Sequence, residues 1–229
     1  MGIKSKNLFD KIRRNNPYFE DFITRSIYNS NAIEGNTLSY AETYAIIFNQ
    51  NDLIVQAKPR DIYEAINLKY AFNYVLRNLD KDLSIGYIKD IGILINKNIN
   101  DIDSFRTTQV FIRGADYIPP PACDVSRLLS ELVYKETKSR DESIFDYAAR
   151  FHILFERIHP FVDGNGRTGR LLISKELLAR GYAPVVIPLS SRAEYLNLIA
   201  NQDINGLSAL LKNLNTFETD RMFKFGIVL

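Results

Sequence analysis

The chain has 229 residues, of which 46% are hydrophobic and 24% charged, and its formal net charge at pH 7 is +2. This composition supplies enough apolar side chains for a folded core, argues against global disorder, and is too mildly charged to indicate a nucleic-acid-binding protein. One cysteine, Cys123, excludes an intramolecular disulfide, and because no apolar run suits a membrane span or a signal peptide, we expect a soluble cytoplasmic protein.

The first predicted helix covers about residues 18–33, because residues 1–16 are polar and uninformative and the apolar residues that follow recur at helical spacing. It should stop at Gly35, since glycine readily takes the left-handed conformation of a helix cap. Ser39 and Glu42 have the spacing of a capping box, which predicts the start of another helix.

Two more helices are predicted at residues 60–79 and 84–96, and after them the residue pattern changes from helical to strand-like. Residues 107–112 are mainly β-branched and aromatic, residues 113–116 have turn composition, and residues 117–118 suit a short return strand. The pattern predicts a two-stranded β-hairpin, which must lie on the helical body because an isolated hairpin is only marginally stable in water.

Helical periodicity returns in the second half. One helix should begin near Asp124 or Ser126, another covers residues 143–158, and two more are predicted at residues 191–200 and 205–217. The expected fold class is therefore all-α, with one short β-hairpin.

The segment from His159 to Arg170 has an unusual chemical composition. It combines a base, a carboxylate (Asp163), three glycines, an amide (Asn165) and two arginines, Arg167 and Arg170. Leucines at helical spacing follow it, so the segment should open a helix, and free N–H groups at a helix N-terminus bind anions. Arginine side chains match phosphate oxygens in geometry. These features predict a polyphosphate cradle with a base and a cation-binding carboxylate beside it.

Two simpler interpretations fit less well. Gly164-x-Gly166-x-x-Gly169 matches a dinucleotide-binding fingerprint, but that motif needs a preceding strand, and residues 145–158 have a helical period. His152 lies on the apolar face of that predicted helix, so we expect a buried core histidine there. A structural turn would explain the glycines but not the charged residues around them.

The sequence His159-Pro160-Phe161-x-Asp163-Gly164-Asn165-Gly166-Arg167-x-x-Arg170 resembles the complete signature of Fic-domain proteins. The resemblance implies a mostly helical Fic fold, with one domain over residues 1–229. It also implies a protein adenylyltransferase, which moves AMP from ATP onto a Ser, Thr or Tyr hydroxyl of a protein, itself included as a candidate target.

The same resemblance implies roles for individual residues. His159 would take the proton of the attacking hydroxyl, Asp163 would bind Mg²⁺, and Phe161 would anchor the loop in the core. The groups expected to bind ATP are the anion hole, the arginines that hold the β- and γ-phosphates, and two residues that a looser alignment places near the adenine: Gly164, Asn165, Gly166, Arg167, Arg170, Tyr195 and Asn201.

A second motif precedes this core. Ser30-Asn31-Ala32-Ile33-Glu34-Gly35 resembles the inhibitory motif of Fic proteins in its N-terminal, class II arrangement, with an inhibitory helix over about residues 17–35. Ser30 and Glu34 are four residues apart, so they share one helix face and can enter one cleft together. The resemblance implies that the Glu34 carboxylate pairs with Arg170. The alternative is that Glu34 is only a solvated helix end.

The resemblance also implies that the predicted hairpin, at about residues 106–118, is a flap beside the active site. Such a flap would clamp the target by strand pairing, here through Gln109, Val110, Phe111 and Ile112.

Other functions stay open at this point. The chain could transfer another phosphate-containing group, remove AMP from modified targets with Glu34 positioning water, or act as a nucleotide-sensing binding module without chemistry. The target protein is not indicated by the sequence, and a homo-oligomer stays open. We expect no nucleic-acid or membrane partner.

Overall fold

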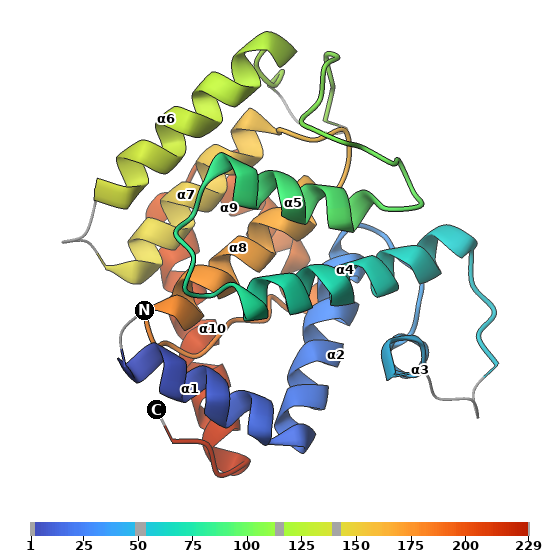
Figure 1. Cartoon of the computed structure of the whole chain (residues 1–229), viewed down its shortest axis with the longest axis vertical. Helices are drawn as coiled ribbons and strands as arrows, with labels where there is room; N and C mark the ends of the chain where they lie inside the picture. Colours follow the sequence, from blue (N-terminus) through green and yellow to red (C-terminus); the bar gives the residue numbers. More distant parts are fainter. Residues whose placement is uncertain (1–2, 49–53, 113–116, 139–142, 229) are drawn as a thin grey trace.

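The computed structural model describes residues 3–48, 54–112, 117–138 and 143–228. Within these ranges the chain forms ten α-helices and two short 3₁₀ turns, and no strand (Figure 1). The elements are α1 (Ile3–Arg14), α2 (Asn16–Ile33), α3 (Tyr40–Phe48), α4 (Pro59–Arg77), α5 (Ile85–Asn96), η1 (Ala122–Asp124), α6 (Val125–Lys138), α7 (Ile144–Ile158), α8 (Asn165–Ala179), η2 (Leu189–Ser191), α9 (Arg192–Ala200) and α10 (Ile204–Lys224).

Helix α8 lies at the centre of the fold, with α4 and α5 on one side of it in Figure 1. It packs against α7, α5, α4 and α2, and nearly every residue along it is buried. A helix buried on all sides carries apolar residues around its whole circumference, and the run Leu171, Leu172, Ile173, Leu177 and Leu178 does so here. The N-terminus of α8 is therefore held rigidly by the surrounding helices.

Most of the predicted helices are confirmed, with small shifts at their ends. The predicted capping box forms at the start of α3, where Ser39 N donates to Glu42 Oε2 at 2.8 Å and Glu42 N donates to Ser39 Oγ at 3.2 Å. Gly35 has the predicted left-handed conformation, with φ of +95°. None of the helices in the described part of the chain is both long and apolar enough to cross a lipid bilayer.

Helix α1 was not predicted. It buries Leu8 and Ile12 against the body, and these two residues are too few to give a clear period in a polar segment. Asn15 separates it from α2, where the Asn15 side chain accepts a hydrogen bond from Tyr18 N at 3.2 Å.

A cluster of ion pairs fixes α2 to the C-terminal helix α10. Arg25 pairs with Glu218 at 2.8 Å and with Asp21 on its own helix, and Tyr18 donates a hydrogen bond to Glu218 at 2.7 Å. Arg221 of α10 pairs with Asp21 in turn. Because the cluster is largely buried and every charge has a partner, α2 has a well-defined position on the body.

The structure does not show the predicted β-hairpin. Residues 107–112 and 117–118 form no strand, and the four residues between them lie outside the described ranges. The two arms are joined through a side chain instead, because Gln109 Nε2 donates to Pro119 O at 2.9 Å. Residues 119–121 are prolines, which have no N–H to donate, and this limits the backbone ladder that the return arm can form.

Candidate active site

A cleft of about 310 Å³ opens where α7 ends and α8 begins. The end of α2 and the helix α9 close two of its sides. The residues that line it are Glu34, Ile112, Tyr117, Glu156, His159, Val162, Asp163, Gly164, Asn165, Gly166, Arg170, Tyr195, Leu196, Ile199 and Ala200. Most of the site residues predicted from the sequence therefore lie together in one cleft.

His159 follows the last residue of α7 and adopts a left-handed backbone conformation, with φ of +50°. Its Nδ1 lies 3.3 Å from the main-chain oxygen of Glu156. Because a carbonyl only accepts hydrogen bonds, Nδ1 carries the proton, and Nε2 of the neutral ring is left as the basic nitrogen. Burial lowers the pKa of His159, which favours this neutral form near pH 7.

The first turn of α8 presents unpaired main-chain donors. Within the described ranges, the N–H groups of Asn165, Gly166 and Arg167 donate no hydrogen bond. The side chain of Asn165 is not free, because it bonds both the N–H and the carbonyl of Phe161 at 2.9 Å. Asn165 therefore shapes the loop with its side chain and offers an anion only its backbone N–H, as helix N-termini do.

Asp163 lies at the edge of the cleft between two arginines. Its Oδ1 accepts hydrogen bonds from Gly164 N at 2.6 Å and from Arg167 at 3.0 Å, and Oδ2 pairs with Arg60 of α4. Burial opposes ionisation of the Asp163 carboxyl, but the two arginines outweigh it and lower its pKa. The carboxylate is thus ionised at neutral pH.

This environment is compatible with a hard divalent cation. The described part of the chain holds no group of three or more His, Cys, Asp or Glu residues arranged as metal ligands. Magnesium, however, commonly uses only one or two carboxylates together with phosphate oxygens. Asp163 offers such a carboxylate, and of the two arginines beside it Arg60 is the exposed one, with 54% of its side chain accessible.

The two signature arginines have different positions. Arg167 is buried away from the cleft, where it pairs with Asp163 and lies 3.1 Å from Glu64 without a well-aligned hydrogen bond. Arg170 borders the cleft and donates to Glu34 Oε1 at 2.7 Å, to Ser30 O at 2.9 Å and to Ser30 Oγ at 3.0 Å. Of the predicted phosphate-binding pair, the structure brings only Arg170 to the cleft.

The Glu34–Arg170 pair lies against the backbone of α8. A Cβ at position 166 would overlap Glu34 Oε1 and lie 2.9 Å from Arg170 Nη1, so Gly166 leaves the space that the pair occupies. Glu34 thereby holds a negative charge beside the free N–H groups of the same turn. The Glu34 carboxylate therefore repels an anion that approaches these N–H groups.

The two residues expected near an adenine behave differently. Tyr195 lines the cleft, but its hydroxyl is occupied by Arg170 Nη1 at 3.3 Å and by His152 Nε2 at 2.6 Å. Asn201 does not line the cleft, because its Nδ2 turns back to the carbonyl of Asn197 at 2.9 Å. His152 is a fully buried core histidine, as the apolar face of its helix predicts.

Several residues that shape the site were not predicted. Arg106 donates to His159 O at 2.8 Å, and its own N–H donates to Pro160 O at 2.9 Å, which fixes the base of the flap to the signature loop. Asn96 donates to Asp163 O at 3.0 Å. Arg60 and Glu64 also contact the loop. All four lie 53 to 103 residues before their partners, and no spacing pattern reveals contacts of that kind.

Comparison with known proteins adds an independent line of evidence. Residues 82–177 match the model of the Fic/DOC family. Proteins named protein adenylyltransferase Fic from Drosophila grimshawi and Drosophila melanogaster are each 34% identical over 181 residues, or 76% of this chain and 36% of theirs. The chain therefore spans about a third of the length of these curated relatives.

Solved structures agree in fold. A Fic domain containing signaling protein from Bacteroides thetaiotaomicron has a TM-score of 0.78 at 22% identity, with 93% of each chain covered. Fic-1 from C. elegans has a TM-score of 0.76 at 24% identity, with 97% of this chain and 70% of that chain covered. The signature residues, the family match and the shared helical fold lead to one conclusion: the chain belongs to the Fic/DOC family.

Proposed function

We propose that the chain is a protein adenylyltransferase, which transfers AMP from ATP to a hydroxyl side chain of a protein. The observation that carries this proposal is the position of His159, whose Nδ1 is engaged by the Glu156 carbonyl and whose Nε2 is free to accept a proton. It lines the same cleft as the unpaired N–H groups of α8 and as Arg170. The names of the Drosophila relatives support the same activity.

In this reaction the hydroxyl oxygen of the target attacks the α-phosphorus of ATP. The bond from that phosphorus to the pyrophosphate oxygen breaks, pyrophosphate leaves, and the hydroxyl proton passes to His159 Nε2. The N–H groups at the start of α8 bind the phosphate oxygens, and Arg170 binds the γ-phosphate. Arg167 contributes by holding Asp163 in place.

Asp163 is the residue that would hold magnesium, and the ion would neutralise charge on the phosphates. For that, Arg60 has to leave the carboxylate. Its side chain is half exposed and also pairs with Glu64 at 3.1 Å, so it has an alternative partner on its own helix. Asn100, which donates to Asp163 Oδ2 at 3.2 Å, helps to hold the carboxylate in its orientation.

Ser30 and Glu34 restrain this activity in our proposal. Glu34 and the γ-phosphate need the same guanidinium, so the pair with Glu34 leaves a bound triphosphate without its terminal contact. A misplacement of about 1 Å at the reacting atoms can cost on the order of 10²-fold in rate. ATP can therefore still bind in the restrained state, but with its α-phosphate out of line for attack.

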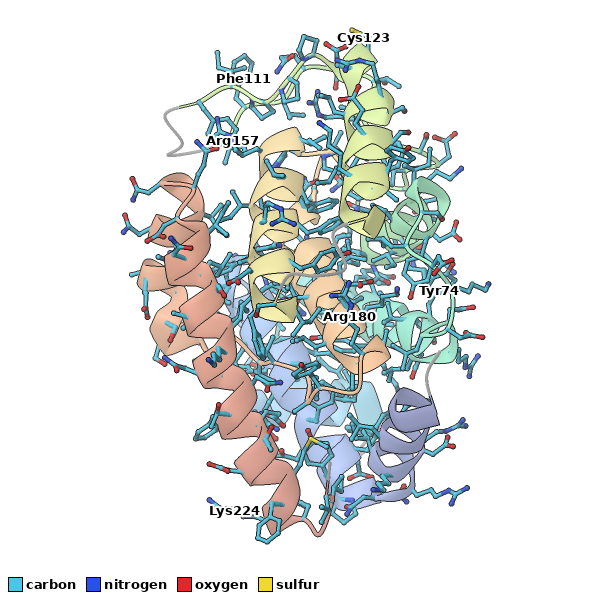
Figure 2. The ribbon with its side chains drawn as sticks, turned by 90° about the vertical axis from the view of Figure 1, so that its left-hand side faces the viewer. Tyr74, Phe111, Cys123, Arg157, Arg180 and Lys224 are labelled. Carbon is cyan, nitrogen blue, oxygen red and sulfur yellow. The ribbon has the colours of Figure 1, made fainter. Side chains whose placement is uncertain are left out.

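The segment of residues 107–112 is the proposed docking site for the target. Ile112 and Tyr117 line the cleft, and Phe111 is 75% exposed on the loop that Figure 2 shows at the top of the molecule. A large exposed aromatic side chain beside a cleft is a common anchor in protein interfaces. The carbonyls of Thr108 and Val110 accept side-chain hydrogen bonds, and the other main-chain groups of this segment are the ones proposed to pair with an extended target segment.

The test is incubation with ATP labelled at the α-phosphate, with magnesium, the chain alone and a lysate of its native host. Transfer of the α-label to protein, confirmed as an added AMP by mass spectrometry, supports the proposal. Transfer only from γ-labelled ATP indicates a phosphotransferase instead. Release of AMP from a modified target indicates the reverse activity, and bound but untransferred ATP, also for the Glu34→Gly variant, indicates a binding module.

A further inference from the structure

Arg170 has a second set of contacts, which does not involve Glu34. We propose that Tyr195 and His152 are positioning residues that hold the Arg170 guanidinium in the cleft independently of Glu34. The proposal builds on the proposed function in one respect, that Arg170 binds a phosphate of the nucleotide.

The contacts form a continuous chain through the interior. Arg170 Nη1 donates to the Tyr195 hydroxyl at 3.3 Å, and that hydroxyl lies 2.6 Å from His152 Nε2. The rings of Tyr195 and His152 are stacked, with centroids 5.8 Å apart and planes inclined by 20°. All three side chains are buried, so water does not compete for these bonds.

The direction of the hydrogen bonds follows from the donors. Arginine only donates, so the Tyr195 oxygen accepts from Arg170. The buried hydroxyl proton then needs an acceptor, and His152 Nε2 lies 2.6 Å away. Nε2 is then an acceptor, and the proton of the neutral ring lies on Nδ1. Burial, together with the nearby Arg170, lowers the pKa of His152 to about 3, which agrees with a neutral ring.

Beyond His152, this series of hydrogen-bonding side chains reaches Glu156. His152 Nδ1 and Glu156 Oε1 are both buried without a hydrogen-bond partner in the described part of the chain. Both atoms border Gly169, where a Cβ would overlap Nδ1 and lie 3.0 Å from Oε1. Burial and the charge of Glu34 raise the pKa of Glu156 to about 8, so its protonated carboxyl offers a neutral acceptor that one bridging water could connect to Nδ1–H.

The two sets of contacts come from different helices. Ser30 and Glu34 belong to α2, whereas His152 belongs to α7 and Tyr195 to α9. Release of the Glu34 side chain therefore leaves the hydrogen bond between Arg170 and Tyr195 in place. A guanidinium that is already oriented does not have to be ordered again when a phosphate arrives, which favours binding and reaction.

The first test is a double-mutant cycle on nucleotide affinity. Binding of α,β-methylene ATP with magnesium, a nucleotide that cannot be cleaved at the α-phosphorus, is measured by calorimetry. In the Glu34→Gly background, Tyr195→Phe is expected to weaken binding about 3- to 10-fold, the effect of one lost hydrogen bond. In the Glu34→Gly/Arg170→Leu background the same change should have no effect. An equal loss in both backgrounds would overturn the proposal, because Tyr195 would then contact the nucleotide itself.

The second test uses His152, which does not line the cleft. His152→Gln places an acceptor near the position of Nε2 and is expected to retain affinity within about 2-fold, whereas His152→Leu should reproduce the loss of Tyr195→Phe. Loss in both variants, with melting temperatures unchanged, would contradict the proposal.

The tautomer of His152 gives a readout that needs no activity at all. Nitrogen-15 NMR of the histidine side chains should find the His152 proton on Nδ1 in the wild type. A proton on Nε2 would make His152 the donor to Tyr195 and would overturn the proposal. These binding and NMR results stand even if the chain transfers no AMP, so failure of the proposed function is distinguished from failure of this inference.

Discussion

Glu34 and Arg170 are 136 residues apart in the chain, and their side chains meet at 2.7 Å on the wall of the cleft. Burial lowers the pKa of Arg170, but Tyr195 and Glu34 together raise it above its ordinary value, so Arg170 stays charged in the interior. The same guanidinium is the only one that the described part of the chain brings to the cleft beside the α8 N-terminus. The pair thus places the proposed restraint and the proposed phosphate contact on a single group.

The first prediction concerns the base. His159→Ala should lower AMP transfer on the order of 10²- to 10⁴-fold, because general-base catalysis is lost, while ATP affinity changes little. Transfer assays and calorimetry measure the two effects separately. Wild-type transfer by this variant would remove His159 from the mechanism.

The second prediction is a pH dependence. Burial lowers the pKa of His159, with Arg106 acting in the same direction and the Glu156 carbonyl, Glu34 and Asp163 opposing it. The basic form is therefore present at lower pH than for an exposed histidine, and kcat/KM should rise with pH to a plateau with a midpoint below about 6.5. The measurement is best made with Glu34→Gly, which removes one neighbouring carboxylate. A midpoint above the ordinary histidine value would contradict the assignment.

The third prediction concerns Arg60 and the cation. Arg60→Gln should tighten binding of Mn²⁺, used as a paramagnetic probe for Mg²⁺ in the presence of ATP, because it removes the cation that now pairs with Asp163. Asp163→Asn should weaken the same binding. Arg127→Gln is a matched control, since Arg127 is a similarly exposed arginine paired with carboxylates on and beside α6. Equal manganese affinity in Arg60→Gln and Arg127→Gln would show that Arg60 does not compete.

The fourth prediction concerns target docking. Phe111→Ser should reduce modification of a protein target at least 5-fold, in line with an interface anchor of more than about 1 kcal/mol, without changing ATP affinity. Phe217→Ser, at an exposed phenylalanine of α10, provides the control. If both variants modify the target equally, the segment of residues 107–112 is not the docking site.

Features set by residues close together in the sequence could be predicted, whereas contacts between residues far apart in the sequence could not. Helices α2 to α10 follow from apolar period and caps, and the signature segment carries its own chemistry within twelve residues. The contacts of Arg60 and Glu64 with that segment arise only when α4 packs on α8, and a sequence contains no period for such pairing. Asn201 lies six residues after Tyr195, but a local bond to Asn197 turns it away from the cleft. Residues 107–112 have strand-like side chains, but within the described ranges they form no strand with residues 117–118.

The most direct measurement is the rate of α-labelled AMP transfer by Glu34→Gly relative to the wild type, at saturating ATP and magnesium. The account predicts a faster rate in spite of a lower melting temperature, because Arg170 is freed while an ion pair is lost. Ser30→Ala should act in the same direction more weakly, and Glu34→Gly/Arg170→Ala should lose the gain. Transfer by Glu34→Gly at or below the wild-type rate, with ATP bound, would contradict the account.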